Sequence, residues 1–339
     1  MEKFFDHAPK IAHRLAAAQA ARTMSLDLAA IRAAHARIRP HIFRTPVLTN
    51  ARLDAACGGK LFFKCENLQK VGAFKARGAT NAVFSLTDAE AAHGVATHSS
   101  GNHAAALARA AKLRGIRAHI VMPSNSSKIK VHTVEGYGGK ITFCEPTQAA
   151  REQACAKIMA ETGAVLIHPF EDERVMAGQG TATLELLEDH PDLDLILCPV
   201  GGGGLLAGTA IAAKGLRPQI KIIAVEPAEA GDAAQSFRAG RQMPFTHAAT
   251  IADGLRTNVG TPNFAIMQHD VADVVTVSEA AIVAGMRLIW EAVKIVIEPS
   301  AAVPYAAILD KRVEVAGLRV GILLTGGNVD LDALPWMKK

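Results

Sequence analysis

Short apolar runs alternate with helix-like segments along most of this chain, and this alternation limits the fold more than any other feature. Between most of the runs lie 10 to 20 residues whose apolar positions repeat every three or four residues, as in 103–114 and 149–162. The runs cover 61–65, 94–98, 117–122, 140–144, 164–168, 193–200, 220–226, 271–277 and 318–325. Strands that alternate with helices form parallel sheets covered on both faces. We therefore expect an α/β protein.

The length of the chain indicates two lobes with a ligand cleft between them. A single hydrophobic core stops growing near roughly 250–300 residues, and this chain has 339. The sequence contains no internal repeat and no Pro/Gly/Ser linker, so we expect the lobes to be interleaved along the chain. In open α/β sheets ligands bind where strands end and helices begin, and the loops after the strands are therefore the place to search.

The first 24 residues are expected to be an extension or an accessory helix. They are rich in Ala and Arg, as transit peptides are, but Glu2 and Asp6 argue against a transit peptide. Ser25 is a good N-cap for a new helix that starts at Leu26.

Charge and cysteine usage exclude several classes of protein. The net charge is +5, with a pI near 9.0 and no Lys/Arg run, so nucleic acid is not indicated and at most a weak preference for anionic ligands follows. The five cysteines contain no C-x-x-C pair, which suggests neither a disulfide framework nor a zinc site and fits the cytoplasm. The uncharged stretch 195–213 is not expected to span a membrane, because Pro199 and four glycines interrupt it.

Two loops place reactive or anion-binding groups after predicted strands. In 72–79, Lys75 lies in a turn of small residues behind Phe74, which suits a lysine that forms a Schiff base, although the turn alone fits a solvated lysine at a helix start better. In 97–103, hydroxyls, an amide and backbone N–H groups gather where a helix begins. Such a helix start can bind a carboxylate, and it can equally be a simple N-cap.

A third loop, 199–205, contains four consecutive glycines and favours phosphate binding, because their N–H groups can surround one phosphate at a helix start. The same segment satisfies the dinucleotide pattern G-x-G-x-x-A through Gly202, Gly204 and Ala207, with Glu226 at the end of the next strand. An NAD-dependent oxidoreductase therefore remains an alternative, although it leaves the lysine loop unexplained. In a fourth loop, 323–328, Thr325 could bond a heteroaromatic nitrogen or simply end a strand.

Taken in this order, the four segments resemble the fold-type II pyridoxal phosphate (PLP) enzymes, specifically the threonine dehydratase and serine racemase group. The resemblance runs from about Ile38 to Leu334, and its strongest part is Glu66 followed by 71–78, which is similar to the family's cofactor-lysine signature with Ala73 in place of the commoner serine. Segments 72–75, 298–304 and 325–332 look similar to the 3-hydroxyaspartate dehydratases.

The resemblance implies a role for each matching residue. Lys75 would hold the cofactor and later move the Cα proton, and Ser100 would be a second acid/base on the opposite face of the ring. The cofactor would also contact Phe74, Asn102, Thr325 and the phosphate loop of Gly201, Gly202, Gly203, Gly204 and Leu205. The substrate would lie near Ser99, Ser100, Asn102, His103, Arg151 and Asp253, and a Mg²⁺, Mn²⁺ or Ca²⁺ ion near Glu226, Ala230 and Asp232.

The same resemblance implies the organisation and the activity. It places a large PLP-binding domain at 25–92 plus 172–339, a small mobile domain at 93–171, and two chains in a homodimer. The expected reaction is an α,β-elimination of water that converts 3-hydroxyaspartate, threonine or serine to a 2-oxo acid or imine and ammonia. A serine- or aspartate-type racemase, a β-replacement synthase and a non-catalytic PLP carrier remain alternatives.

Overall fold

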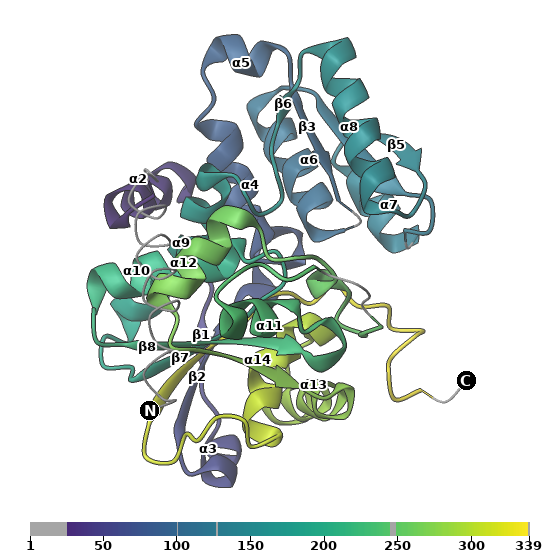
Figure 1. Cartoon of the computed structure of the whole chain (residues 1–339). Helices are drawn as coiled ribbons and strands as arrows, with labels where there is room; N and C mark the ends of the chain where they lie inside the picture. Colours follow the sequence, from purple (N-terminus) through teal and green to yellow (C-terminus); the bar gives the residue numbers. More distant parts are fainter. Residues whose placement is uncertain (1–25, 100, 127, 245–248, 338–339) are drawn as a thin grey trace, which may run out of the picture.

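The chain forms two sheets in the computed structural model, which describes residues 26–99, 101–126, 128–244 and 249–337 (Figure 1). The larger sheet has six strands in the order β1-β2-β10-β7-β8-β9, and the smaller has four in the order β5-β4-β3-β6. Every pair of neighbouring strands is parallel except β1 with β2. The expected α/β class with mostly parallel sheets is confirmed.

All nine predicted strands are present, eight of them with shifted ends and the one at 140–144 with the predicted bounds. The strands are β1 (Val47–Leu48), β2 (Lys60–Cys65), β3 (Val95–His98), β4 (Ala118–Pro123), β5 (Lys140–Cys144), β6 (Val165–Leu166), β7 (Leu195–Pro199), β8 (Lys221–Pro227), β9 (Asp273–Val277) and β10 (Arg319–Leu324). The sequence did not predict β1, because a strand of two residues shows no period.

Thirteen α-helices lie among the described residues: α2 (Leu28–Ile38), α3 (Ala51–Cys57), α4 (Lys75–Phe84), α5 (Asp88–Ala92), α6 (Asn102–Arg114), α7 (Lys128–Gly136), α8 (Gln148–Thr162), α9 (Glu173–Asp189), α10 (Gly204–Leu216), α11 (Asp232–Ala239), α12 (Thr261–Asp270), α13 (Glu279–Val293) and α14 (Pro299–Leu309). Local sequence sets many of their ends. In α8, for example, the Thr147 hydroxyl accepts a hydrogen bond from Ala150 N, and Gly163 ends the helix with a φ of 71°.

The first described helix starts later than the sequence suggested. The prediction of a helix from Leu26 is wrong, because α2 begins at Leu28 and its N-cap is Asp27, whose carboxylate accepts a hydrogen bond from Ala30 N. Ser25 and the predicted extension 1–24 lie outside the described residues.

The large sheet is buried on both faces, which explains its continuous apolar strands. On one face Ile196 and Cys198 of β7 pack against α2, α9, α10 and α12. On the other face Leu195 and Leu197 pack against α13 and α14. Successive side chains of a strand point to opposite faces, so both sets of β7 residues must be apolar. We call this sheet with these helices the large lobe.

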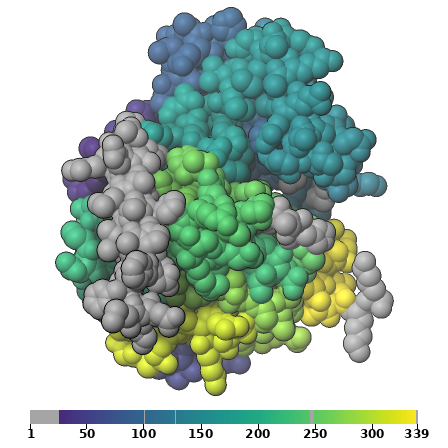
Figure 2. All heavy atoms as spheres, in the orientation of Figure 1, coloured from purple at the N-terminus to yellow at the C-terminus, as the bar shows by residue number. Residues whose placement is uncertain are grey.

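The small lobe consists of the four-stranded sheet with α6, α7 and α8. In Figure 2 it is coloured blue to teal and lies above the green and yellow part of the chain. Its core also contains Ala82, Val83, Leu86 and Ala91 from α4, α5 and the turn between them. These residues precede position 93, so the core of the small lobe extends into the segment that connects the lobes.

The uncharged stretch 195–213 is divided between β7 and α10, with the glycine loop between them. No helix in the described part of the chain is both long enough and apolar enough to cross a membrane.

Candidate functional site

One cavity of about 450 Å³ contains most of the side chains that the sequence singled out. It lies where the loops after β2, β3, β7 and β10 meet. The predicted residues that line it are Phe74, Lys75, Ser99, Asn102, His103, Arg151, Gly201, Gly202, Gly203, Gly204, Leu205, Asp253 and Thr325. Ser100 lies outside the described residues. The predicted metal ligands Glu226, Ala230 and Asp232 are not among the residues that line this cavity.

Lys75 is the first residue of α4 and reaches into this cavity. The turn before it is fixed to the end of β10, because Phe74 N donates to Thr325 O at 3.0 Å and Ala73 forms an isolated bridge with Gly326. The amine of Lys75 donates to Pro169 O at 2.8 Å. Burial lowers the pKa of Lys75 to about 8, so about a tenth of the amine is uncharged and nucleophilic at pH 7, far more than in an ordinary lysine.

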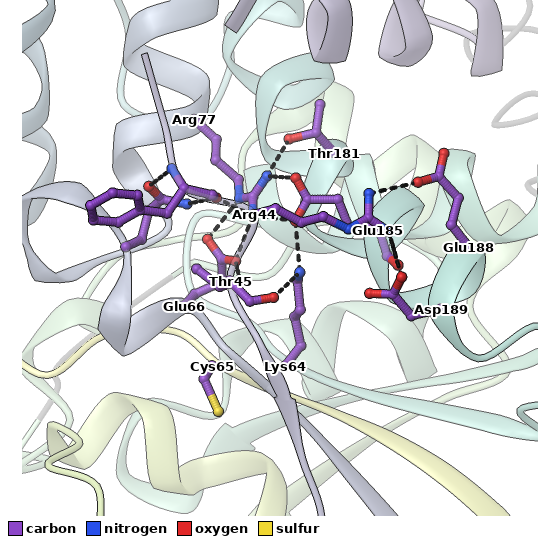
Figure 3. A network of polar contacts seen from close by, with 12 residues as sticks. Arg44, Thr45, Lys64, Cys65, Glu66, Arg77, Thr181, Glu185, Glu188 and Asp189 are labelled. Atoms are coloured by element: carbon purple, nitrogen blue, oxygen red, sulfur yellow. Dashed lines mark hydrogen bonds and ion pairs between the residues drawn. The ribbon is translucent and has the colours of Figure 1, made fainter. Parts of the chain in front are cut away.

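A buried ion-pair network holds the start of α4 in place (Figure 3). Arg77, which has no exposed side-chain surface, donates to both carboxylate oxygens of Glu66 at 2.7 and 2.8 Å and to both of Glu185 at 2.8 and 2.7 Å. Lys64 donates to the same Glu185 at 2.6 Å. Two buried cations thus face two buried carboxylates. Burial acts to raise the pKa of Glu185, but hydrogen bonds from His35 and Arg77 outweigh it and hold this pKa well below its ordinary value.

The glycine loop has no room for side chains. A Cβ on Gly202 would lie 2.3 Å from the ring of Phe170, one on Gly201 would lie 2.9 Å from the Cα of Leu255, and Gly203 has a φ of 88°. Packing therefore requires these glycines, as does close approach of a phosphate. The helix that follows, α10, has no side-chain cap at its N-terminus, so its first N–H groups are available to an anion.

A second helix starts at the cavity without a side-chain cap. Its N-cap residue is Gly101, and Asn102 is its first residue. Ser99 lies just before it, where its hydroxyl accepts a hydrogen bond from Gly101 N at 3.3 Å. Two uncapped helix N-termini, those of α6 and α10, therefore face the same cavity as the Lys75 amine.

The histidines of the cavity are neutral near pH 7. Burial lowers the pKa of His98 and of His168 to about 4 and that of His103 well below its ordinary value. His103 Nε2 lies 3.2 Å from Ile167 O and must carry the proton, whereas Nδ1 is buried without a partner among the described residues. Its free nitrogen can therefore accept a hydrogen bond, but it cannot donate one to a substrate carboxylate.

Arg151 and Asp253 lie at the cavity in different surroundings. Arg151 Nε makes a long hydrogen bond to Thr147 O at 3.4 Å. Burial is the main cause of the low pKa of His98, His168 is the second, and the positive charge of Arg151 lowers that pKa further. Asp253 forms an ion pair with Lys130 of α7, which brings an acid of the large lobe against a base of the small lobe.

Glu226 and Asp232 form a separate buried acidic pair. Their exposed fractions are 1% and 6%. Burial, with a contribution from the charge of Asp232, raises the pKa of Glu226 to about 8. Burial also raises the pKa of Asp232, to about 6. Glu226 accepts hydrogen bonds from Ala233 N and Ala234 N at 3.2 and 2.6 Å, so its carboxylate faces α11 and cannot bind a ribose in the cavity. The described residues contain no group of three or more His, Cys, Asp or Glu that could hold a metal.

Glu298 and Phe170 also line the cavity, and the sequence did not single them out for the site. Glu298 stands at the N-cap position of α14 but makes no side-chain cap there, and instead it accepts hydrogen bonds from Asn102 Nδ2 at 2.9 and 3.2 Å. An acidic residue at a helix start next to Pro299 is usually a cap, so the sequence carried no separate signal for this role.

Comparisons with known proteins identify the family of this chain. Residues 38–326 match the family model described as pyridoxal-phosphate dependent enzyme. The chain is 51% identical over 304 residues to the beta-hydroxyaspartate dehydratase of Paracoccus denitrificans (strain Pd 1222), covering 90% of this chain and 96% of that one. It is 50% identical over 313 residues to the serine racemase of Arabidopsis thaliana, covering 91% of this chain and 95% of that one.

A solved structure gives the same result. The structure of maize serine racemase matches with a TM-score of 0.89 at 47% sequence identity, covering 91% of this chain and 95% of that one. The expected fold-type II resemblance is confirmed, and the NAD-dependent alternative loses its support. The chain therefore belongs to the pyridoxal-phosphate dependent enzyme family.

Proposed function

We propose that this enzyme is a PLP-dependent dehydratase that converts a β-hydroxy amino acid, foremost 3-hydroxyaspartate, into a 2-oxo acid and ammonia. The observation that supports this most is that one cavity contains a lysine amine with a pKa of about 8 and two uncapped helix N-termini. The α10 terminus suits the cofactor phosphate, and the α6 terminus suits the carboxylate of an amino acid. The 51% identity to a beta-hydroxyaspartate dehydratase favours this substrate.

The described residues fit the cofactor. Lys75 would hold it, Phe74 would pack beside its ring, and the N–H groups of 201–205 would bind its phosphate. Thr325, a buried hydroxyl at the end of β10, would meet the ring nitrogen. When bound to an amino acid, the cofactor withdraws electrons and acidifies the Cα–H bond.

In the proposed reaction Lys75 removes the proton from Cα at its Nζ atom, and the Cβ–O bond breaks as a nearby acid protonates the leaving hydroxyl. Water is lost in this step and added again when the C–N bond is hydrolysed. The 2-oxo acid and ammonia together therefore contain the same atoms as the substrate. Ser99 and the N–H groups that begin α6 would hold the carboxylate, with Asn102 and Arg151 beside it.

Borohydride labelling and a substrate panel test this proposal. Reduction of the holoprotein should attach the pyridoxyl group to Lys75, and Lys75→Ala should lose both this label and the visible absorption band. Release of 2-oxo acid from 3-hydroxyaspartate, threonine and serine is then compared. An unlabelled Lys75 rules out the PLP site, and labelling without 2-oxo acid release rules out the lyase.

A racemase is the second candidate, since a serine racemase is 50% identical. The proposed second acid/base, Ser100, would protonate the opposite face of Cα. Chiral chromatography of residual substrate separates the two activities. Inverted serine without 2-oxo acid identifies a racemase, and Ser100→Ala should then abolish inversion.

We also propose a divalent cation at Glu226 and Asp232, with the carbonyl of Ala230. A cation would stabilise two buried carboxylates whose pKa values burial has raised, and hard oxygen ligands suit Mg²⁺, Mn²⁺ or Ca²⁺. Millimolar Mg²⁺ should raise the Tm of the protein but not that of Asp232→Asn. An equal shift in both proteins would mean that Mg²⁺ binds elsewhere.

The organisation implied by the resemblance also stays part of the proposal. The large domain would comprise 25–92 and 172–339, the small domain 93–171 would move against it, and two chains would form a homodimer in the cytoplasm. The five cysteines are all free, which suits a reducing compartment. Sedimentation of the holoprotein measures the number of chains directly.

A further inference from the structure

We propose that Glu298 and Asn328 are positioning residues that fix which atom of the Asn102 side-chain amide faces the cavity, so that Asn102 presents an N–H donor to the ring oxygen of the cofactor. This inference rests on the proposed PLP site and concerns how the chain prepares that site. It assigns a function to a buried carboxyl group that the proposed reaction does not use.

The first anchor lies at Asn328, just after β10. Asn328 Nδ2 donates to Val71 O at 2.7 Å and to Asn102 Oδ1 at 2.9 Å. A backbone carbonyl can only accept, so the amide nitrogen of Asn328 must face Val71. The same nitrogen then meets Asn102, and the Asn102 atom opposite it must be the oxygen.

The second anchor lies at Glu298, before α14. Asn102 Nδ2 donates to its two carboxylate oxygens at 2.9 and 3.2 Å. An ionised carboxylate can only accept, so the Asn102 atom opposite it must be the nitrogen. The hydrogen bonds to Asn328 and to Glu298 thus require the same orientation of the Asn102 amide. The two oxygens belong to one carboxylate and can share one hydrogen of the NH₂ group, which leaves the other hydrogen for a ligand in the cavity.

A purely local role for Glu298 does not explain this geometry. The residue occupies an N-cap position, yet its side chain does not cap α14, and its backbone N–H donates to Gly326 O at 2.9 Å. The residue is only 3% exposed, so removing its carboxyl group from water costs free energy that the Asn102 contact offsets only in part. The hydrogen bonds also join the lobes, since Asn102 begins α6 of the small lobe and Glu298 and Asn328 belong to the large lobe.

Ionisation of Glu298 controls the second anchor. Burial and then the charge of Asp253 raise the pKa of Glu298 to about 7, whereas Lys130, the Asn102 amide and the backbone of Asn328 act in the opposite direction. Above pH 7 the carboxylate accepts only and holds the amide. Below pH 7 the protonated oxygen can donate, so this anchor no longer excludes a flipped amide and Asn328 alone holds the orientation. The cofactor site should therefore be better prepared above neutral pH.

The test is a PLP titration of the resolved apoprotein, with the visible band recorded from pH 5.5 to 8.5. Glu298→Gln keeps the shape of the side chain but offers a donor and an acceptor. We expect it to weaken PLP binding about tenfold at pH 8 and to remove the change in affinity around pH 7, so that only the change near pH 8 set by Lys75 remains. Asn102→Ala should lose at least as much, and the Glu298→Gln/Asn102→Ala double variant should lose no more than Asn102→Ala.

Two further variants keep the outcome decisive. Asn328→Ala tests the other anchor without touching a charge and should weaken PLP binding in the same direction. Glu279→Gln changes a carboxylate that accepts from Ile251 N and does not line the cavity, and it should leave PLP binding unchanged. Additive losses in the Glu298→Gln/Asn102→Ala double variant, or a pH 7 transition that persists in Glu298→Gln, would overturn the proposal. If the wild-type protein itself captures no PLP at Lys75, the proposed function fails first.

Discussion

At the scale of single residues, the reactive property of this chain is the basicity of one amine. Lys75 donates to Pro169 O and lies inside the cavity, where burial alone lowers its pKa to about 8. An ordinary lysine has a pKa of about 10.4. A lowered pKa means that the uncharged form is reached at lower pH, and the uncharged form is the one that attacks an aldehyde.

We therefore predict that the apoprotein captures PLP with a rate that rises with pH to half its maximum near pH 8. Stopped-flow absorbance measures this rate. In the same protein, brief reductive methylation followed by mass spectrometry compares Lys75 with Lys157, whose side chain is 76% exposed. Lys75 should be modified at lower pH than Lys157. A capture rate that keeps rising steeply up to pH 10 would show that burial does not set the basicity of this amine.

The contact between Gly202 and Phe170 gives a second prediction at this scale. A methyl group on Gly202 would lie 2.3 Å from the Phe170 ring, so Gly202→Ala should lower the free energy of unfolding by about 1–3 kcal/mol. Adding Phe170→Ala removes the ring, and the double variant should lose less than the sum of the two single changes. Gly136→Ala, where no atom lies within 4 Å, is the control. Strict additivity of the two changes would rule out the clash.

At the scale of elements, the ion-pair network ties the start of α4 to α9 and to the end of β2. Arg77→Met leaves the buried carboxylate of Glu66 without its cationic partner and that of Glu185 with Lys64 and His35, and it should lower the free energy of unfolding by about 3–5 kcal/mol. Urea unfolding measures this change. Arg287→Met removes one partner of an exposed pair, with side chains 60% and 48% exposed, and should have no measurable effect. Equal stability of the two variants would mean that the network contributes little.

The same network shows what sequence reasoning can and cannot reach. The nine strands could be predicted because each is a short apolar run of neighbouring residues. The loops that contain Lys75, the four glycines and Thr325 could be predicted because each directly follows such a run. Arg77 and Glu185, in contrast, are 108 positions apart, and Asn102 and Glu298 are 196 apart. No local pattern encodes these pairs. The sequence indicated the glycine loop as a phosphate-binding segment. Its packing against Phe170 could not be predicted, because α9 and β7 separate that residue from the loop along the chain.

At the scale of the whole molecule, the cavity depends on how the two lobes meet. Ser99, Asn102 and Arg151 reach it from the small lobe, and the glycine loop and Thr325 from the large lobe. The Asn102–Glu298 hydrogen bonds and the Lys130–Asp253 ion pair cross between the lobes at this point. Any relative movement of the lobes must therefore break or stretch these contacts.

The Lys130–Asp253 pair is partly exposed, at 19% and 41%, so salt should weaken it. If the pair mainly holds the lobes together over the substrate, Asp253→Asn should raise KM more than it lowers kcat in low salt, and the two proteins should converge in about 1 M salt, where the Debye length is about 3 Å. Glu161→Gln removes a carboxylate from the exposed Lys157–Glu161 pair within α8 and should change neither constant. A fall in kcat at unchanged KM, independent of salt, would place Asp253 in the chemical step instead, because an interaction made only in the transition state lowers kcat without weakening substrate binding.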